Sequence, residues 1–353
     1  MFRLANLCGV ALGLGVALVL VILLNVARTY WIAPEGHRVV LQAATPAGDA
    51  PRALTAADFE WCQQRELPPY AAPAGWQSKP VLQLRLQEGS GACSALIGVL
   101  IGAAYAEVKG HAYWIDESST RLKGNHSYWF RRFFQPRGLE ARRGNATKDA
   151  TFADEVTTLT RMPYIEVGGG ARLPRTRALR HWLRRVWAFQ PWVQQRVCPA
   201  LAALNLHWPY IGLMVRRGDK NTKEKRPNVP IEQLKDTMEG LSLGLTREVF
   251  VGSDDCRVLA ELRAAMPDWT FRSLCHLYDA RGWFLESDTK SDLDAHFFKF
   301  FGEMMALAAS AIYIGDGWSN VQNWVTYMRP GNSSNATFID MRKYPFYDLA
   351  RRL

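Results

Sequence analysis

The stretch IGLMVRRGDK, residues 211–220, decides the fold, because it is a short apolar run that ends abruptly in charged residues. Two later stretches have the same pattern, EVFVGSDD at 248–255 and AIYIGDGWSN at 311–320. The segments between them have the composition of helices, at 231–239, 256–265 and 295–309. Short apolar runs that alternate with helices are typical of buried parallel strands joined by crossover helices. The sequence therefore predicts an α/β lobe in the C-terminal part of the chain.

Polar chemistry is concentrated where these predicted strands end. In open parallel sheets, ligands bind outside the carboxyl ends of the strands. The residues at those ends are Arg216, Arg217, Asp219, Lys220, Asp254, Asp255, Ser319 and Asn320. We therefore expect a ligand site along this edge of the sheet.

Length and charge narrow the class of protein. The chain has 353 residues, and single hydrophobic cores rarely exceed about 250 to 300 residues, so two lobes are expected. With 48% hydrophobic and 22% charged residues, the composition argues against collagen, a coiled coil, wholesale disorder and a polytopic membrane protein. The net charge of +10 favours anionic ligands such as phosphates, nucleic acid or acidic lipid.

The N-terminal region predicts a membrane anchor. Residues 7–24 form an uncharged run, and its 18 residues would span about 27 Å as a helix. The alternative is a cleaved signal peptide, whose apolar stretch is shorter, about 7 to 15 residues. We predict a cytoplasmic tail at 1–6, an uncleaved signal anchor at 7–26 and a stem rich in alanine and proline at 27–80. Both alternatives carry the rest of the chain across the membrane.

Glycosylation acceptors favour a lumenal compartment. Four N-x-S/T sequons occur, at Asn125, Asn145, Asn332 and Asn335, where about one is expected by chance. We therefore expect a single-pass type II protein of the Golgi or endoplasmic reticulum membrane, with its folded part in the lumen. The sequence leaves the oligomeric state open.

The cysteines are compatible with this compartment. Besides Cys8 in the apolar run, five remain, and none forms a C-x-x-C pair that would indicate zinc or a redox site: Cys62, Cys93, Cys198, Cys256 and Cys275. They can form at most two disulfides in an oxidising lumen, and buried thiols without a bridge are an equal alternative.

The region after the stem predicts a second, N-terminal lobe. Its first part contains a strand at 81–86, a helix at 92–108 after the glycines of EGSG, and a strand at 111–115. We place this N-terminal lobe at 81–205 and the C-terminal lobe at 206–353.

The rest of the N-terminal lobe is less regular. A loop-rich aromatic stretch extends to about residue 170, and a helical region at 178–204 is interrupted by Pro191 and Pro199. Arginines interleaved with tryptophans between Arg172 and Trp187 could bind nucleic acid. In a lumenal protein a solvated or membrane-facing helix is the expected alternative, so no nucleic-acid partner is predicted.

Arg216 and Arg217 form the candidate anion site. A planar guanidinium at a strand end can hold a phosphate through two parallel hydrogen bonds, which makes pyrophosphate a natural ligand. The alternative is a structural pair with an acid such as Asp219. Because successive side chains of a strand point to opposite faces, we expect one arginine to bind the ligand and the other to brace the loop.

The glycine-rich loop at 314–321 supplies a second candidate contact for phosphate. Its glycines would let backbone amides and the Ser319 hydroxyl approach a phosphate oxygen. The loop has neither the P-loop spacing nor the dinucleotide pattern G-x-G-x-x-G, so ATPase and dehydrogenase functions lose their main support.

The string IGLMVRRGDKNTKE, at 211–224, resembles the signature of GDP-fucose-dependent fucosyltransferases of the α1,6 type and of their bacterial chitin-oligosaccharide relatives. VFVGSDD and the stretch DLDAHFFKFFGEMMALAASAIYIGDGWSNV resemble the second and third motifs of this superfamily, which includes the protein O-fucosyltransferases. The similarity extends over roughly residues 80–345. It implies a GT-B-like fold with two facing Rossmann-like lobes, of which 81–205 is the acceptor-side lobe and 206–353 the nucleotide-sugar-binding lobe. It also implies an inverting transferase that uses GDP-fucose as donor substrate and needs no metal.

The resemblance also implies roles for individual residues. Arg216 becomes the pyrophosphate ligand and Arg217 its essential neighbour, while Asp219 and Lys220 shape the loop and contact substrates. Glu224 falls on the position of the catalytic base, and the cations beside it favour its carboxylate form. Asp294 and His296, the ends of a D-x-H sequence, match GDP-sugar-binding residues, and the Asp294 carboxylate is the acceptor for guanine. Asp254 and Asp255 match a pair near the nucleotide and fucose. Ser319 and Asn320 match the loop on the phosphate side.

Departures from the family pattern leave alternatives open. Met214 stands where the family has a histidine, and it cannot donate a hydrogen bond to nucleotide; Gly218 replaces a threonine. The long helical stem and terminal SH3-like domain of the α1,6 enzymes do not fit within this chain, so the acceptor does not transfer. The alternatives are a catalytically silent sugar-binding or scaffold protein and a transferase for another nucleotide sugar.

A metal-dependent mechanism is the last alternative. Asp292 and Asp294 form a D-x-D sequence like the metal motif of a different glycosyltransferase fold. That motif needs a hydrophilic loop, whereas a helical sequence follows here, and arginines can neutralise a diphosphate without metal. We therefore predict no metal site.

Overall fold

The computed structural model describes most of the chain from residue 51 onward, and all the described residues belong to one compact unit, Thr45–Arg351. The described ranges are 51–63, 81–86, 91–109, 112–118, 122, 128–135, 164–167, 171–174, 182–183, 186–218, 227–242, 246–282, 292–315, 319–329 and 337–340.

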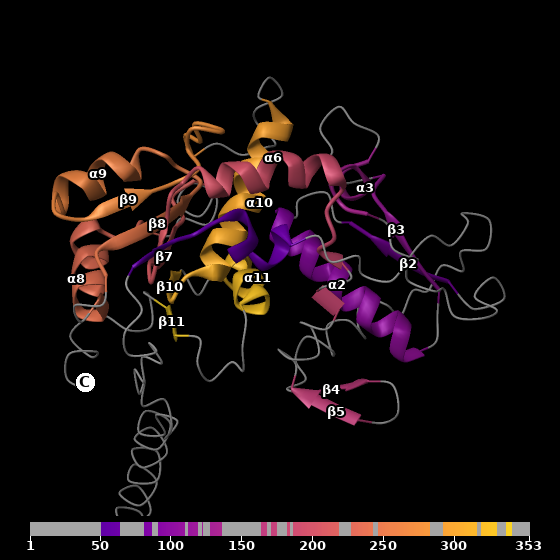
Figure 1. Ribbon diagram of the computed structural model, residues 1–353. Coiled ribbons are helices and arrows are strands. Elements are labelled where there is room, and N and C mark those ends of the chain that lie inside the picture. The colour runs from indigo at the N-terminus through magenta and orange to yellow at the C-terminus, as the bar shows by residue number, and fades with distance from the viewer. Residues whose placement is uncertain are drawn as a thin grey trace, which may run out of the picture. The chain divides into compact units, whose positions relative to one another are not determined.

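A five-stranded parallel sheet forms the C-terminal part of this unit, with the strand order β11-β10-β7-β8-β9 (Figure 1). Every neighbouring pair in it is parallel. The strands are β7 (Ile211–Val215), β8 (Glu248–Ser253), β9 (Thr270–Arg272), β10 (Ile312–Gly315) and β11 (Thr337–Asp340). The α/β class predicted for this part is confirmed, and so are the three strands predicted from the apolar runs.

Helices cover both faces of this sheet, because the side chains of its buried strands alternate between two cores. Leu213 and Val215 pack in the core that contains α8 (Ile231–Ser242) and α9 (Val258–Ala265). Met214, which points to the opposite face, packs in the core that contains α10 and α11. The last two helices span Leu293–Ala309 and Asn320–Met328. In Figure 1, α8 and α9 accordingly lie on the side of the strands away from α10 and α11.

The strand order reverses beside β7, and this decides where a ligand can bind. The chain runs outward from β7 through β8 to β9, and α10 then returns it to β10 on the other side of β7. In open parallel sheets, the ligand crevice lies at the carboxyl ends of the strands where the order reverses. The loops that follow β7 and β10 therefore lie at this switch point.

A second, separate parallel sheet precedes it in the chain. Strands β2 (Val81–Arg85) and β3 (Ala112–Asp116) pair in parallel and are joined by α2 (Ala92–Lys109), so they form a βαβ unit. These elements match the strand, helix and strand predicted from sequence. The antiparallel hairpin of β4 (Tyr164–Val167) and β5 (Ala171–Pro174) was not predicted. The facing arrangement of two GT-B lobes stays a prediction.

An aromatic core joins segments that the sequence assigns to different lobes. Phe301 of α10 lies at its centre, with ring centroids 5.1 to 5.6 Å from five other rings. Those rings belong to Phe133, Phe134, Trp187, Phe189 and Phe297. Phe133 lies in the short helix α3 (Phe130–Phe133), and α10 also packs against α6 (Pro191–Ala202). The predicted lobes therefore share one continuous core in this region.

Pro199 lies inside α6, whereas the sequence predicted that it would interrupt the helix. The burial of Val193, Val197 and Leu201 along one side of α6 keeps the helix continuous, because tertiary packing outweighs the hydrogen bond that a proline cannot donate. Pro191 is the first residue of α6, where a missing N–H group is tolerated.

Part of the predicted stem is folded onto the unit. β1 (Arg52–Ala53) pairs with β6 (His207–Trp208), and Phe59 is only 1% exposed. Cys62, in the second of two short 3₁₀ helices (Ala56–Asp58 and Glu60–Cys62), is bonded to Cys198 of α6. Residues 51–63 therefore differ from the unpacked stem expected over 27–80, because a disulfide and a buried ring hold them. The rest of the predicted stem, at 27–50 and 64–80, lies outside the residues that the structure describes.

The cysteine prediction of at most two disulfides is confirmed. Cys62–Cys198 and Cys256–Cys275 form, and Cys93 is the free, buried cysteine among the described residues. Within the ranges that the structure describes, no helix is long and apolar enough to cross a bilayer. The predicted tail and anchor at 1–26 and the sequons at Asn125, Asn145, Asn332 and Asn335 lie outside those ranges.

The Cys62–Cys198 disulfide should contribute strongly to stability, because its partners are 136 residues apart and the bond restricts a long loop in the unfolded chain. We expect a Cys62→Ala, Cys198→Ala double variant to lose about 2 to 5 kcal/mol of unfolding free energy in urea titrations. Cys93→Ala is the matched control, since it removes a buried thiol but no crosslink. Equal urea midpoints for the double variant and the wild type would contradict the assignment.

Candidate functional site

The loop after β7 is held by one carboxylate from the neighbouring strand. Asp254, directly after β8, accepts the backbone N–H of Arg217 at 2.8 Å and that of Gly218 at 3.1 Å. Its Oδ2 also lies 3.2 Å from Nε of Arg216. The carboxylate therefore satisfies two loop amides and pairs with a guanidinium at once, which fixes the loop at the switch point.

The two adjacent arginines turn to different partners. Arg217 forms two parallel bonds with Glu261 of α9, at 2.5 and 2.9 Å, and braces the loop against that helix. Arg216 pairs with Asp254 instead. Both arginines therefore pair with an acid, and the expectation that one of them binds the ligand while the other braces the loop stays a prediction. The resemblance gave both residues a ligand-binding role; for Arg217 the structure offers a bracing contact.

The first turn of α2 contains the buried thiol of Cys93. Burial raises the pKa of Cys93 to about 12, and the positive charge of Arg216 opposes the rise. Gly91, which precedes α2, has nothing within 4 Å of the position that a Cβ would take. The start of α2 therefore borders open space, and its buried thiol is within the electrostatic reach of Arg216.

The N-terminal end of α11 meets the same end of α2. Asn320, the first residue of α11, donates a hydrogen bond from Nδ2 to Oγ of Ser94 at 2.9 Å. Ser319 caps α11, and its hydroxyl accepts the backbone N–H of Val321 at 3.3 Å. Helix N-termini carry partial positive charge and unpaired N–H groups, so they attract anions. Two of them and Arg216 make this end of the sheet suited to a phosphate or diphosphate.

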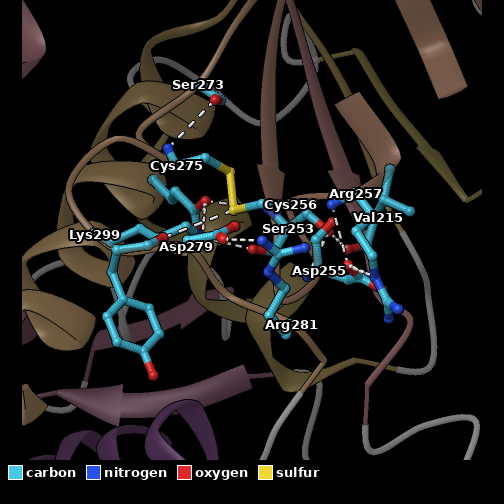
Figure 2. Close-up of a disulfide and its surroundings, with 12 residues drawn as sticks. Val215, Ser253, Asp255, Cys256, Arg257, Ser273, Cys275, Asp279, Arg281 and Lys299 are labelled. Atoms are coloured by element: carbon cyan, nitrogen blue, oxygen red, sulfur yellow. Dashed lines mark hydrogen bonds and ion pairs between the residues drawn. A yellow bond between two sulfur atoms is a disulfide. The ribbon is translucent and has the colours of Figure 1, made fainter. Parts of the chain in front are cut away.

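A segment from beyond β9 folds back over the loop after β8. Cys256 donates its N–H to the Ala280 carbonyl, and Gly282 donates to the Asp254 carbonyl, both at 2.7 Å. The disulfide between Cys256 and Cys275 ties the same segment (Figure 2). Gly282 has φ +77°, a conformation that favours glycine, and it packs against Gly218. The segment 275–282 therefore contacts both the loop after β7, at Gly218, and the loop after β8, at Asp254 and Cys256.

Asp255 pairs with Arg257 and forms a β-bridge with Arg281 of this segment. It accepts hydrogen bonds from Nε of Arg257 at 2.8 Å and from Nη2 at 2.6 Å (Figure 2). These bonds hold the pKa of the Asp255 carboxyl below its usual range. Because only the folded state has the depressed pKa, this contribution to stability is present at neutral pH and is lost as the pH falls through the folded-state pKa.

The end of β8 rests on a buried ion pair of α10. Lys299 Nζ lies 2.5 Å from both Oε1 of Glu303 and the carbonyl oxygen of Ser253. The same Glu303 oxygen accepts the Ser253 amide at 3.2 Å. Burial raises the pKa of the Glu303 carboxyl, while Lys299 opposes the rise. Sequence reasoning missed this pair, although two charged residues four positions apart in an apolar helix were a visible signal.

Asp294 and His296 lie in the first turn of α10. Both oxygens of Asp294 accept hydrogen bonds from Arg132, at 2.9 and 2.5 Å. The ring of His296 packs edge-on against Tyr278. Met214, in the position of the family histidine, is 2% exposed, and its sulfur lies against Gly252 of β8. The guanine-binding role of Asp294 and the GDP-sugar contact of His296 stay predictions, and Asp294 would have to exchange Arg132 for the base.

Three predicted site residues, Asp219, Lys220 and Glu224, lie outside the described residues. Their roles stay predictions. The D-x-D alternative has no support in the geometry, because Asp292 caps α10 by accepting the Ala295 amide at 3.0 Å and Asp294 pairs with Arg132. Among the residues that the structure describes, no group of three or more His, Cys, Asp or Glu could hold a metal ion.

The chain was compared with known protein families, curated proteins and solved structures. No protein-family model and no curated protein sequence matches the chain. A crystal structure of NodZ alpha-1,6-fucosyltransferase with GDP is 17% identical with a TM-score of 0.47, covering 71% of this chain and 93% of that one. POFUT1 in complex with GDP is 11% identical with a TM-score of 0.40, covering 74% and 98%.

An Arabidopsis thaliana FUT1 mutant in complex with GDP is 12% identical with a TM-score of 0.41, covering 75% of this chain and 77% of that one. These identities and TM-scores are too low to identify the chain. The residues of the site carry the functional argument.

Gly218 should be intolerant of any side chain. A Cβ there would lie 2.8 Å from the Gly282 carbonyl oxygen and 3.0 Å from Oδ2 of Asp254. We expect Gly218→Ala to displace the loop and to lower the free energy of unfolding by about 1 to 3 kcal/mol, measured in urea. Gly98→Ala in α2, where the Cβ would meet nothing within 4 Å, should leave stability equal or higher. Equal effects of the two substitutions would contradict the close packing of Gly218 against Gly282.

Cys93 should be unreactive in the native protein, because a pKa of about 12 leaves almost no thiolate at pH 8. We expect iodoacetamide to label Cys93 at pH 8 only after denaturant is added, as measured by peptide mapping. The ordinary thiol pKa is 9.0, so the unfolded chain loses this proton first, and the contribution to stability declines from about pH 9 to pH 12. Rapid labelling of the folded protein would show that the thiol is exposed.

Proposed function

We propose that the chain is a glycosyltransferase that binds the diphosphate of a nucleotide sugar at the switch point between β7 and β10. The observation that carries this proposal is the position of Arg216: Asp254 holds it where β7 ends, at the carboxyl edge of the sheet. The meeting of Asn320 and Ser94 brings the N-terminal end of α11 to the same place. A diphosphate needs several such positive groups within a short distance.

In the proposed glycosyl transfer, these positive groups would act on the leaving nucleoside diphosphate. In the proposed reaction an acceptor hydroxyl attacks the anomeric carbon, the bond from that carbon to the β-phosphate oxygen breaks, and the nucleoside diphosphate leaves. Arg216 and the helix N-termini stabilise the charge that grows on the diphosphate. Glu224 takes the proton of the hydroxyl, and attack from the opposite face inverts the anomeric centre. The charge on the diphosphate is neutralised without a metal in this proposal.

GDP-fucose is the proposed donor, and a glycan or glycoprotein is the proposed acceptor. Support for the donor comes from the motif IGLMVRRGDKNTKE and from the order of the three motifs along the chain. The α1,6 linkage stays a hypothesis, and the departures at Met214 and Gly218 leave room for another nucleotide sugar.

We further propose that the protein is anchored in the Golgi or endoplasmic reticulum membrane by residues 7–26, with its folded part in the lumen. The four sequons support this address. The two disulfides support it too, because disulfides persist mainly in oxidising compartments.

A catalytically silent sugar-binding protein is the second candidate. Two observations favour it: Met214 is packed in the core in place of a nucleotide-binding histidine, and Arg132 engages both oxygens of Asp294. Such a protein would bind GDP-fucose without turnover.

The donor site is tested by comparing Arg216→Met with Arg217→Met. Because a charge-assisted hydrogen bond contributes about 1.5 to 3 kcal/mol, Arg216→Met should weaken GDP binding at least tenfold in titration calorimetry. Arg217→Met should act mainly on stability, by breaking the pair with Glu261. Wild-type GDP affinity in a folded Arg216→Met protein would contradict the assignment of Arg216 as a diphosphate ligand.

Catalysis is tested separately with labelled GDP-fucose and a panel of glycan acceptors. We expect transfer that persists in EDTA and is lost in Glu224→Gln, whose side chain cannot accept the proton. GDP binding without transfer or donor hydrolysis would favour the silent binding protein.

A further inference from the structure

Helix α10 contains a buried pair of charged residues in a part of the core that is otherwise mostly apolar. Lys299 and Glu303 are each 3% exposed, in a helix whose other buried residues are mostly apolar. A buried ion pair contributes little net stability, since desolvation offsets the attraction, and apolar residues of similar volume serve a core as well. A role beyond packing is therefore to be sought in what the pair touches.

Both members of the pair contact the backbone of one residue. Lys299 donates to the Ser253 carbonyl at 2.5 Å, and Glu303 accepts the Ser253 amide at 3.2 Å. Ser253 is the last residue of β8. The pair thus bonds both backbone polar groups of the residue at which β8 ends.

Ser253 in turn connects two strand ends. Its hydroxyl donates to the Val215 carbonyl at 2.9 Å, where β7 ends, and accepts the Asp255 amide at 3.0 Å (Figure 2). Asp254, the next residue, holds the amides of Arg217 and Gly218 and pairs with Arg216. The chain of contacts therefore runs from α10 through Ser253 and Asp254 to the guanidinium proposed to bind phosphate.

We infer that Lys299 and Glu303 are positioning residues for the phosphate site: they set the place of Ser253, and through Asp254 they set the place of Arg216. This inference rests on the proposed function for its consequence in binding. Its structural part, the hold on the loop after β7, stands on the contacts alone.

The central experiment replaces the pair by apolar residues, Lys299→Met with Glu303→Leu. The matched control is Arg329→Met. Arg329 is also buried, and it anchors the opposite end of α10 through bonds to Leu307, Ser310 and Ala311. Both variants lose buried polar anchors of the same helix, but only the first faces the candidate site.

Hydrogen exchange and GDP affinity are measured on both variants and on the wild type. We expect exchange of the Arg217 and Gly218 amides to accelerate at least tenfold in Lys299→Met/Glu303→Leu, with GDP binding weakened about tenfold. Arg329→Met should lower the urea midpoint while the exchange of these two amides and the GDP affinity stay at the wild-type values. Wild-type exchange in the double variant, or the same losses in the control, would overturn the inference.

Two conservative changes keep the test decisive if the double variant does not fold. Glu303→Asp keeps the charge but withdraws the carboxylate from the Ser253 amide, so exchange at Arg217 and Gly218 should accelerate. Glu303→Gln keeps the reach and an acceptor oxygen, so it should stay closer to the wild type. The reverse order would refute positioning by contact.

The same data separate this inference from the proposed function. If wild-type protein binds no GDP, the nucleotide-sugar assignment fails. Accelerated exchange at Arg217 and Gly218 in the variants would then still support the positioning contact.

Discussion

The arrangement of the candidate site depends on the Asp254 carboxylate. It accepts two backbone amides from the loop after β7 and pairs with Arg216. Loop amides beside a buried strand need partners, and water cannot easily supply them there. One short side chain from the next strand supplies them, and it thereby aims a guanidinium at the end of the sheet.

The surrounding structure keeps this carboxylate in place. The Lys299 and Glu303 pair bonds to the backbone of Ser253, the residue before Asp254. On the other side in the sequence, Gly282 donates to the Asp254 carbonyl, and the Cys256–Cys275 disulfide ties the segment 275–282 to the same loop. Supports on both sides are what a binding site requires, since a group must hold its geometry before the ligand arrives. The helix N-termini then add a field that favours an anion.

Elements with a strong local signal were predicted, and elements that depend on distant partners were not. The runs 211–215 and 249–252 are apolar throughout, so burial on both faces of a sheet is evident from composition. The strands at 270–272 and 337–340 are short and mix polar with apolar residues, and only pairing at the sheet edge makes them strands. The folded segment at 51–63 was missed because its disulfide partner is 136 residues away, and pairing cannot be deduced from spacing.

By itself, the sequence determined that the C-terminal part is an α/β lobe whose charged residues gather at the strand ends, since the period of burial and the carboxyl-end rule are local properties. Only the tertiary structure decided which partner each of those residues takes. Arg216 and Arg217 are neighbours in the chain, yet one pairs with Asp254, 38 residues away, and the other with Glu261, 44 residues away. Strand order and helix packing set those distances, and neither is encoded in the residues that the two arginines adjoin.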